Sequence, residues 1–279
     1  MSLITLTDAL ADAAAREAGL AAFNVIQLEH AEAYAAAAEA TGLPVVMQIS
    51  ENCVKYHGAL RPLALATLAI AEACTQPVVV HLDHAEDVDL VREAVEVGLT
   101  SVMYDGSTLS DEANRARTRE VVQLCHAAGV SVEAELGEVG GKDGVHAPGV
   151  RTDPDEAAQF VADTGVDALA VAVGSSHAMT QRTAALDEDL IVRLASSVPV
   201  PLVLHGSSGV PDEGLVGAVR AGMRKVNIAT HLNQVFTTAA TDYLSEKPTV
   251  DTRKYVGAGR SAVAAEAARL MRLLAERLR

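Results

Sequence analysis

The segment Pro77–Asp87, PVVVHLDHAED, shows the pattern on which the fold prediction rests. Its first half is apolar and β-branched, which is typical of a strand buried on both faces of a parallel sheet. It is followed by Asp87–Val97, where apolar residues recur at the spacing of an amphipathic helix. A buried strand followed by such a helix is the repeating unit of α/β folds.

Eight apolar runs of this kind alternate with helical stretches along the chain. The runs are Ala21–Val25, Pro44–Ile49, Pro77–Leu82, Thr100–Tyr104, Val130–Glu135, Asp167–Val173, Pro201–Leu204 and Arg224–Ile228. Eight strand–helix units in 279 residues predict one α/β domain, a (β/α)8 TIM barrel spanning residues 1–279, with extra helices at both termini. An open doubly wound sheet is the alternative, but no G-x-G-x-x-G motif follows the early strands.

The amino-acid composition argues against nucleic acids and membranes as partners of this protein. The chain has 22 Lys and Arg against 37 Asp and Glu, a formal net charge of −15, without a basic block. Nucleic-acid binding needs clustered positive charge, and no apolar run approaches the ~20 residues that cross a bilayer. The N-terminus lacks the features of a secretory signal, and the three cysteines are far apart. We therefore expect a cytoplasmic protein without nucleic-acid or membrane partners.

A polar residue stands at the end of every predicted strand, where a barrel enzyme carries its chemistry. Of nine histidines, only three lie immediately past a strand, namely His84, His177 and His205. Three neutral imidazoles that converge from different strands would form a zinc site with one position open for substrate or water. The alternative is that these histidines only form hydrogen bonds in loops. The other strand-end residues are Asn24, Ser50, Asp83, Asp105, Glu135 and Asn227.

The strand-end acids allow more than one role. Asp83 adjoins His84, although the alternation of side chains along a strand could turn the two apart. A carboxylate beside a metal is a candidate acid–base group, or it orients a histidine ligand. Asp105 and Glu135 could be outer ligands, an alternate metal position, or partners of the ligands.

Small residues follow the seventh and eighth strands, where barrels commonly bind phosphate. A metal with an open position beside a phosphate site could polarise the carbonyl of a phosphorylated hydroxyketone. A lysine Schiff base would be another solution, with Lys225 as its candidate. The small residues that follow the seventh and eighth strands are Gly206, Ser207, Ser208, Ala229 and Thr230.

The glycine-rich connection Leu136–Thr152, which follows the fifth strand, is long enough to serve as a lid.

With these motifs the chain resembles the class II, zinc-dependent ketose-bisphosphate aldolases, the fructose- and tagatose-bisphosphate aldolase family. The matching stretches cover almost the full length in the family's order. They are HLDHAED (His81–Asp87), SVMYDGS (Ser101–Ser107), SVEAELGEVGG (Ser131–Gly141), DALAVAVGSSH (Asp167–His177), PLVLHGSSGVP (Pro201–Pro211), KVNIAT (Lys225–Thr230) and DTRKY (Asp251–Tyr255).

The resemblance implies a lyase and a role for each matching residue. His84, His177 and His205 would bind catalytic zinc, with Asp105 and Glu135 as alternate zinc ligands. Asp83 would exchange the proton of the C4 hydroxyl, and Asn227 would contact the dihydroxyacetone phosphate enediolate. The remaining positions would contact substrate: Asn24 and Ser50 in the pocket, and Gly206, Ser207, Ser208, Ala229 and Thr230 at the phosphate.

Two positions depart from the family pattern. The third histidine motif usually continues as His-Gly, which helps to hold phosphate or a monovalent cation, and Ala178 argues against that cation site here. The mobile loop usually carries a glutamate that exchanges the C3 proton. Here Asp143 would have to replace it, or is only a solvated loop charge. The distal phosphate would need a cation, and Arg253 and Arg260 near the C-terminus are candidates, or are only surface arginines. They could act across a subunit boundary, since we expect a homo-oligomer, a dimer or tetramer.

We therefore expect a zinc-dependent aldolase that reversibly cleaves a ketose 1,6-bisphosphate. Fructose 1,6-bisphosphate, which gives dihydroxyacetone phosphate and glyceraldehyde 3-phosphate, is the favoured substrate. The alternatives are tagatose bisphosphate, a deoxy-keto-sugar-acid phosphate, and a non-catalytic sugar-phosphate-binding barrel. A metal-assisted hydrolase is less favoured.

Overall fold

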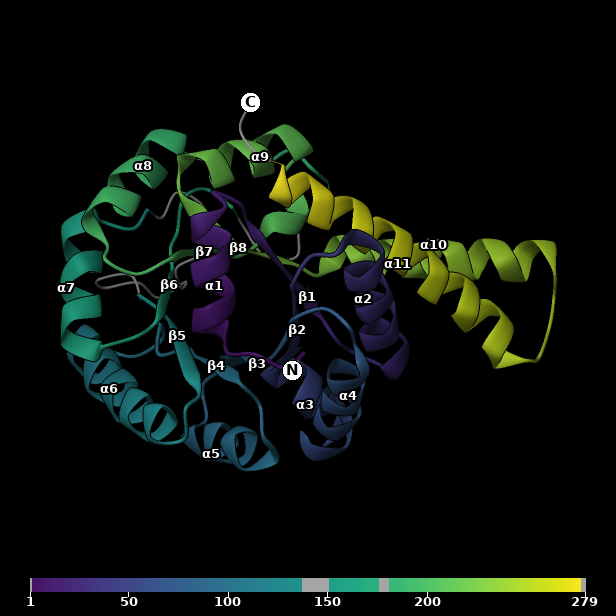
Figure 1. The fold of residues 1–279 in the computed structure, drawn as a ribbon, viewed down its shortest axis with the longest axis horizontal. Coiled ribbons are helices and arrows are strands. Elements are labelled where there is room, and N and C mark those ends of the chain that lie inside the picture. Colours follow the sequence, from purple (N-terminus) through teal and green to yellow (C-terminus); the bar gives the residue numbers. More distant parts are fainter. Residues whose placement is uncertain (1, 137–150, 176–180, 277–279) are drawn as a thin grey trace.

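The structure is a computed structural model that describes residues 2–136, 151–175 and 181–276. Eight parallel strands pair in sequence order, and β8 pairs with β1 to close a barrel (Figure 1). The predicted (β/α)8 barrel is therefore confirmed. The strands are β1 (Leu20–Asn24), β2 (Val45–Ser50), β3 (Val78–Ala85), β4 (Ser101–Tyr104), β5 (Ser131–Glu135), β6 (Ala168–Ala170), β7 (Leu202–Leu204) and β8 (Met223–Ile228).

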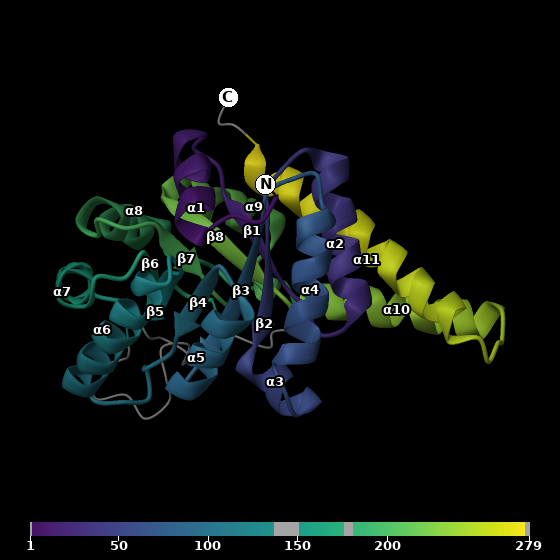
Figure 2. The ribbon, with the colours of Figure 1, turned by 60° about the horizontal axis from the view of Figure 1, so that its bottom comes forward.

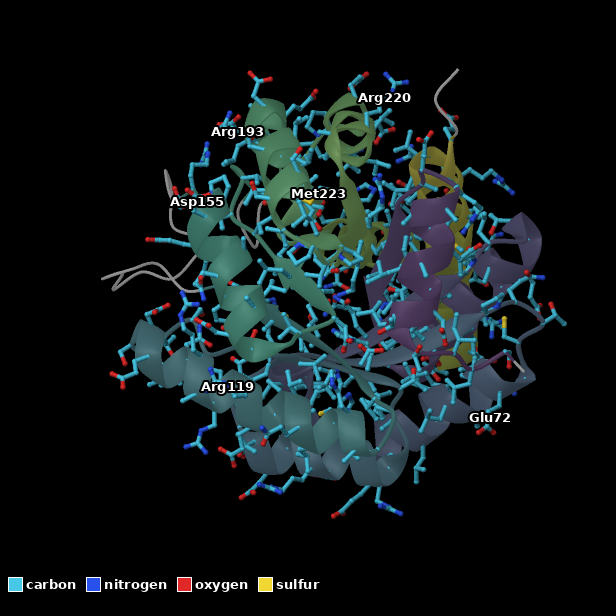
Figure 3. All side chains as sticks on the ribbon, turned by 60° about the vertical axis from the view of Figure 1, so that its left-hand side comes forward. Glu72, Arg119, Asp155, Arg193, Arg220 and Met223 are labelled. Carbon is cyan, nitrogen blue, oxygen red and sulfur yellow. The ribbon has the colours of Figure 1, made fainter. Side chains whose placement is uncertain are left out.

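Helices surround the barrel and carry charged residues on their outer faces. Figure 3 shows labelled charged side chains on the outside of α4, α6, α7, α8 and α9, whereas Met223 of β8 lies inside. The helices between strands are α2 (Leu28–Thr41), α3 (Glu51–His57), α4 (Arg61–Ala73), α5 (Val88–Val97), α6 (Asp111–Ala127), α7 (Pro154–Thr164), α8 (Glu188–Ser197) and α9 (Asp212–Ala221). In the described part of the chain, none is long and apolar enough to cross a membrane.

Local sequence sets the helix boundaries. Asp87 caps α5 by accepting a hydrogen bond from the backbone of Asp89, and Asp153 caps α7 in the same way, ahead of proline at the first helical position. Gly98 ends α5 with φ of 102°, a left-handed conformation that a side chain would disfavour. These caps begin and end the helices at positions from which the chain can return to the sheet.

The N-terminal helix α1 (Leu6–Ala15) closes one end of the barrel. Leu6 and Leu10 are fully buried and pack in one cluster with Val46, Val79 and Met103, which point into the barrel from three strands. Helix α3, which follows β2, lies at the opposite end of the strands (Figure 2). The carboxyl ends of the strands are therefore the end at which a ligand can enter.

The C-terminal helices α10 (Thr230–Glu246) and α11 (Thr252–Ala275) pack on each other and extend away from the barrel as an arm (Figures 1 and 2). Near the barrel, α11 packs against α2. An apolar stripe of α11 is buried in the chain. The stripe consists of Val263, Ala267, Leu270 and Leu274.

The sixth strand is shorter than the predicted Asp167–Val173. The backbone of Val171 still donates to Val203 of β7, but Ala172 then forms hydrogen bonds with Thr152 instead of with β7. The extended conformation therefore outlasts the sheet, because the segment that leads into α7 takes over the pairing.

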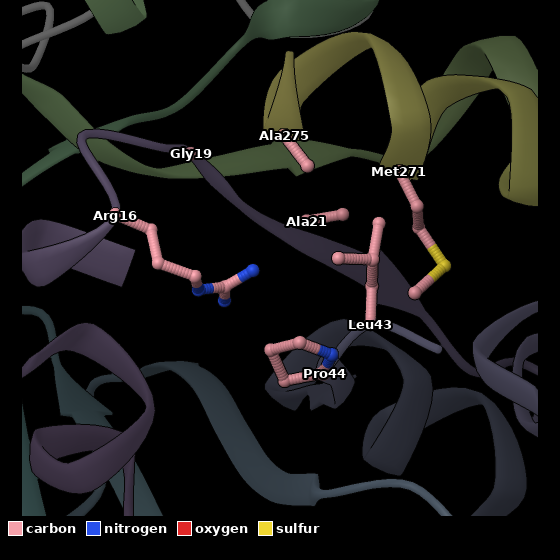
Figure 4. A pocket seen from close by; sticks show the side chains of 7 residues that line it. All are labelled: Arg16, Gly19, Ala21, Leu43, Pro44, Met271 and Ala275. Atoms are coloured by element: carbon pink, nitrogen blue, oxygen red, sulfur yellow. The ribbon is translucent and has the colours of Figure 1, made fainter. Parts of the chain in front are cut away.

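A small pocket lies near the N-terminal ends of the strands, beside α1 and α11 (Figure 4). Its volume is about 10 Å³, roughly the space that one water molecule needs, so it is too small for a substrate. It is lined by Arg16, Gly19, Ala21, Leu43, Pro44, Met271 and Ala275.

Stability should depend on the neutral form of His30. This residue of α2 is buried between the rings of Tyr34 and Phe236, and its Nδ1 accepts a hydrogen bond from the backbone of Ile26. Burial lowers the pKa of His30 to about 4. The imidazole of His30 in the unfolded chain, with a pKa near 6.5, therefore binds more protons as pH falls, and His30 alone should lower the free energy of unfolding by about 2 to 3 kcal/mol from pH 7 to pH 4.5.

Urea titrations at both pH values measure this loss. In His30→Gln, which keeps a hydrogen-bond acceptor without a basic group, the loss should be smaller by that amount. An identical loss in the variant and the wild type would contradict the assignment.

Candidate active site

A cavity of about 170 Å³ lies at the carboxyl ends of the strands. It gathers residues from β1, β2, β3 and the loops after β7 and β8, and most of the predicted substrate and catalytic residues are among them. The lining consists of Asn24, Gln48, Ser50, Asn52, Asp83, His84, His205, Gly206, Ser208, Asn227, Ala229 and Thr230. His177, Ala178 and Asp143 lie outside the described residues.

A distortion of β3 brings Asp83 and His84 to the same cavity. His84 has φ of 49°, and the register between β3 and β4 shifts between Leu82 and Ala85. A left-handed residue at such a bulge interrupts the alternation of side chains, so that two neighbours can face one side. The separation that regular alternation would impose on Asp83 and His84 is therefore removed.

The two described histidines of the predicted metal site face each other. His84 Nε2 lies 2.9 Å from His205 Nδ1. The second nitrogen of each ring contacts a carboxylate: His84 Nδ1 is 2.8 Å from Asp105 Oδ2, and His205 Nε2 is 2.8 Å from Glu133 Oε1. Ionised carboxylates only accept, so these ring nitrogens donate. The facing nitrogens are then left to share a proton or a cation.

The surrounding charges favour a cation at this position. Burial lowers the pKa of His84, but the carboxylates of Asp83, Asp105 and Glu135 outweigh it and raise this pKa to about 10. Burial in turn raises the pKa of Asp105, yet its hydrogen bond and proximity to His84 bring that pKa well below its usual range. An electrostatic field that holds a proton on this partly buried imidazole also attracts a metal ion.

Two sets of ligand atoms are close enough to hold such an ion. Asp83, His84 and His205 form one set, and His84, Asp105 and Glu135 form the other, each with ligand atoms within 4.8 Å of one another. Zinc binds imidazole nitrogens at ~2.1 Å, which places two of them ~3.3 Å apart, close to the observed separation of the rings. The donors therefore fit a divalent metal, and His84 belongs to both sets.

Asp83 is held by two amides. Its Oδ2 accepts from Gln48 Nε2 at 3.2 Å and from Asn24 Nδ2 at 3.5 Å, while Gln48 Nε2 also lies 2.8 Å from Asn24 Oδ1. Its Oδ1 has no hydrogen-bond partner among the described residues. Burial raises the pKa of Asp83. The carboxyl group is thus oriented through one oxygen and has the other available for proton transfer.

The loops after β7 and β8 are tied together where a phosphate was predicted. Ser208 Oγ accepts hydrogen bonds from the backbone of Ala229 and His231, both at 3.2 Å. Gly206 has φ of 67°, which lets the chain turn sharply after β7. The N-terminus of α10 begins at this junction, and its dipole favours an anion. Ser207 is buried and donates to the carbonyl of Leu204.

Lys225 is not placed as a Schiff-base nucleophile. Its Nζ lies 2.7 Å from Glu133 Oε2, and both side chains are fully buried in the barrel. A Schiff base requires a neutral amine, whereas this ammonium group is paired with a carboxylate. The two arginines proposed for the distal phosphate are also paired: Arg253 with Asp251 and Arg260 with Glu32.

Sequence reasoning missed three residues of this region, Gln48, Asn52 and Glu133. Gln48 and Glu133 each interrupt an apolar run, VVMQIS and VSVEAE, with a buried polar side chain. A polar residue inside a run that must be buried on both faces was the available signal, because a buried polar group needs a partner. Asn52 lies on α3, beyond the strand end, and carries no such signal.

Metal binding should release a proton from the facing histidines. If one proton is shared between His84 Nε2 and His205 Nδ1, a metal must displace it, and about one proton per chain should be released on binding Zn²⁺ or Co²⁺ near pH 7.5. Calorimetric titrations in two buffers of different ionisation enthalpy give this number. A binding enthalpy that is independent of the buffer would contradict the shared proton.

The comparisons with known proteins agree with this geometry. The family model described as "Fructose-bisphosphate aldolase class-II" matches residues 4–277. A fructose-bisphosphate aldolase of Geobacillus stearothermophilus is 37% identical over 270 residues, covering 95% of this chain and 94% of the relative. A 6-phospho-5-dehydro-2-deoxy-D-gluconate aldolase of Shouchella clausii is 37% identical over 252 residues, covering 89% of this chain and 86% of the relative.

Among solved structures, the YdjI aldolase from Escherichia coli K12 superposes with a TM-score of 0.87 at 30% identity. The match covers 98% of this chain and 97% of that one. The family model and these relatives extend over the barrel and the terminal helices alike. The chain therefore belongs to the class II fructose-bisphosphate aldolase family, whose members are lyases.

Proposed function

We propose that this protein is a zinc-dependent aldolase that reversibly cleaves fructose 1,6-bisphosphate to dihydroxyacetone phosphate and glyceraldehyde 3-phosphate. The observation that carries the proposal is the convergence of Asp83, His84 and His205 at the mouth of the barrel. The names of the relatives support the substrate.

His84 and His205 would hold the zinc ion, together with His177, which lies outside the described residues. When bound, the ion would supply a Lewis acid that polarises the ketone carbonyl of the substrate. Asp105 and Glu135 would provide an alternate position through the second donor set. The same carboxylates orient the His84 ring and favour a positive charge on it. They therefore contribute to the site whether or not they bind the ion.

Asp83 would transfer the proton that cleavage requires. In the cleavage direction, Oδ1 accepts the proton of the C4 hydroxyl while the C3–C4 bond breaks and C4 becomes an aldehyde. The electron pair of the broken bond remains on the three-carbon fragment, and protonation at C3 completes the reaction. Asp143 would deliver that proton, and it lies outside the described residues. In condensation the same groups act in reverse.

The remaining lining residues would bind the substrate. Asn227 is buried, its Nδ2 lies 3.2 Å from His205 Nε2, and its Oδ1 has no partner among the described residues, so it can contact the enediolate. Asn24 and Ser50 would contact the sugar chain. The phosphate would lie at the junction of the two loops and α10, on Gly206, Ser207, Ser208, Ala229 and Thr230.

Three further inferences accompany this proposal. Free, buried Cys53, Cys74 and Cys125 support a cytoplasmic location, where thiols stay reduced. The projecting arm of α10 and α11 supports a homo-oligomer, a dimer or tetramer. Alanine at 178, where the family has glycine, supports a site without a monovalent cation.

A second candidate substrate is 6-phospho-5-dehydro-2-deoxy-D-gluconate. The relative named for it matches this chain at 37% identity, as does the Geobacillus aldolase. This compound and fructose 1,6-bisphosphate both carry a ketone beside a phosphorylated carbon. At the distal end, fructose 1,6-bisphosphate carries a phosphate, whereas the gluconate derivative carries a carboxylate. Turnover has to decide between them.

Activity should depend on metal and on His84. The wild type should cleave fructose 1,6-bisphosphate in a panel that includes tagatose 1,6-bisphosphate and 6-phospho-5-dehydro-2-deoxy-D-gluconate, and EDTA should abolish turnover. His84→Ala should lose bound zinc and activity together, because His84 belongs to both donor sets. His126→Ala, on the outer face of α6, is the matched control and should retain both. Full turnover without metal would sink the proposal.

Replacing Asp83 should separate metal binding from catalysis. Asp83→Asn keeps the shape of the side chain but cannot accept the proton, so kcat should fall by ~10²–10⁴. Zinc content should stay near that of the wild type, because the proposed ligands are the three histidines and Asp83 would act beside the ion. Asp89→Asn, an exposed position on α5, serves as the control. An unchanged kcat in Asp83→Asn would remove Asp83 from the reaction.

A further inference from the structure

The interior of the barrel holds an ion pair that the proposed reaction does not use. Glu133 lies on β5 and Lys225 on β8, and neither side chain has any exposed surface. The carboxylate receives two donors: Lys225 Nζ at 2.7 Å on Oε2 and His205 Nε2 at 2.8 Å on Oε1. The pair thus lies directly behind one of the two described histidines of the metal site.

We propose that Glu133 and Lys225 are positioning residues that orient the His205 ring toward the metal, an inference that rests on the metal site of the proposed function. Because the carboxylate accepts from Nε2, the hydrogen of the neutral ring is on Nε2, and the lone pair of Nδ1 faces His84. With the other tautomer, a hydrogen on Nδ1 would point at the ion. Glu133 therefore selects the form of His205 that can be a ligand.

Lys225 fixes the carboxylate that performs this selection. A carboxylate bound only to His205 could rotate and offer its second oxygen elsewhere, but Oε2 is held by the ammonium group. His81 bounds the same oxygen from the side: its Nε2 lies 3.9 Å from Oε2, while its Nδ1 is 2.8 Å from Ser101 Oγ. Glu133 is thereby restricted to one orientation.

Stability alone does not account for the pair. Taking a carboxylate and an ammonium group out of water costs free energy that their attraction repays only with good geometry, and apolar side chains of similar size often stabilise a core equally well. The other described histidine has its own carboxylate, since His84 Nδ1 contacts Asp105. Each ring is thus backed by a carboxylate, an arrangement that is common behind histidine ligands of metals.

Two variants test the role without depending on turnover. Glu133→Gln keeps the size of the side chain but must turn its amide donors toward Lys225 or toward His205. The combined replacement Glu133→Leu with Lys225→Met exchanges the ion pair for apolar side chains and should fold even if the single variant is unstable. Lys55→Met, which removes the same charge from an exposed lysine that pairs with Glu51 on α3, is the matched control.

The readouts are the Zn²⁺ affinity, measured by competition with a fluorescent chelator, and the visible absorption spectrum of the Co²⁺-loaded protein. Both Glu133 variants should bind Zn²⁺ ~10–100-fold more weakly and show a shifted Co²⁺ spectrum, and Lys55→Met should match the wild type. Folded variants with wild-type affinity and spectrum would reduce the pair to a structural element and overturn the inference. If the wild type itself failed to bind Zn²⁺ or Co²⁺ at this site, the proposed function would fail first.

Discussion

Two imidazole nitrogens that face each other across 2.9 Å require a positive charge between them, and much of the molecule is arranged around that requirement. Each ring donates its other nitrogen to a carboxylate, so neither can turn its lone pair away. The rings come from β3 and from the end of β7, strands that are far apart in sequence. Only the closed barrel brings them together.

The site is assembled at a cost to the regularity of the sheet. Strand β3 leaves its register before Ala85, and His84 adopts a left-handed conformation that non-glycine residues rarely accept. The barrel core, in turn, contains a carboxylate, an ammonium group and two imidazoles where apolar side chains would pack without partners. Strain and buried charge are thus concentrated on the metal side, while the end closed by α1 is packed with aliphatic and methionine side chains.

The sequence predicted the barrel well because buried parallel strands read as continuous apolar runs, and all eight runs lie within a few residues of the observed strands. The run of the sixth strand was too long, since apolar character persists where the chain pairs with Thr152. The residues at the strand ends predicted the cavity lining, because the carboxyl ends of parallel strands meet at one end of a barrel. The bulge at His84 could not be predicted, because nothing in HLDHAED requires a positive φ. Gln48 and Glu133 were missed because their side chains lie below the strand ends, inside the runs.

The ten-residue helix α1 determines from which end of the barrel a substrate can enter and products can leave. Because α1 packs on the barrel interior at the N-terminal ends of the strands, the cavity formed by the described residues opens at their carboxyl ends. A lyase releases two products from one substrate, and both would leave through the opening by which the substrate entered.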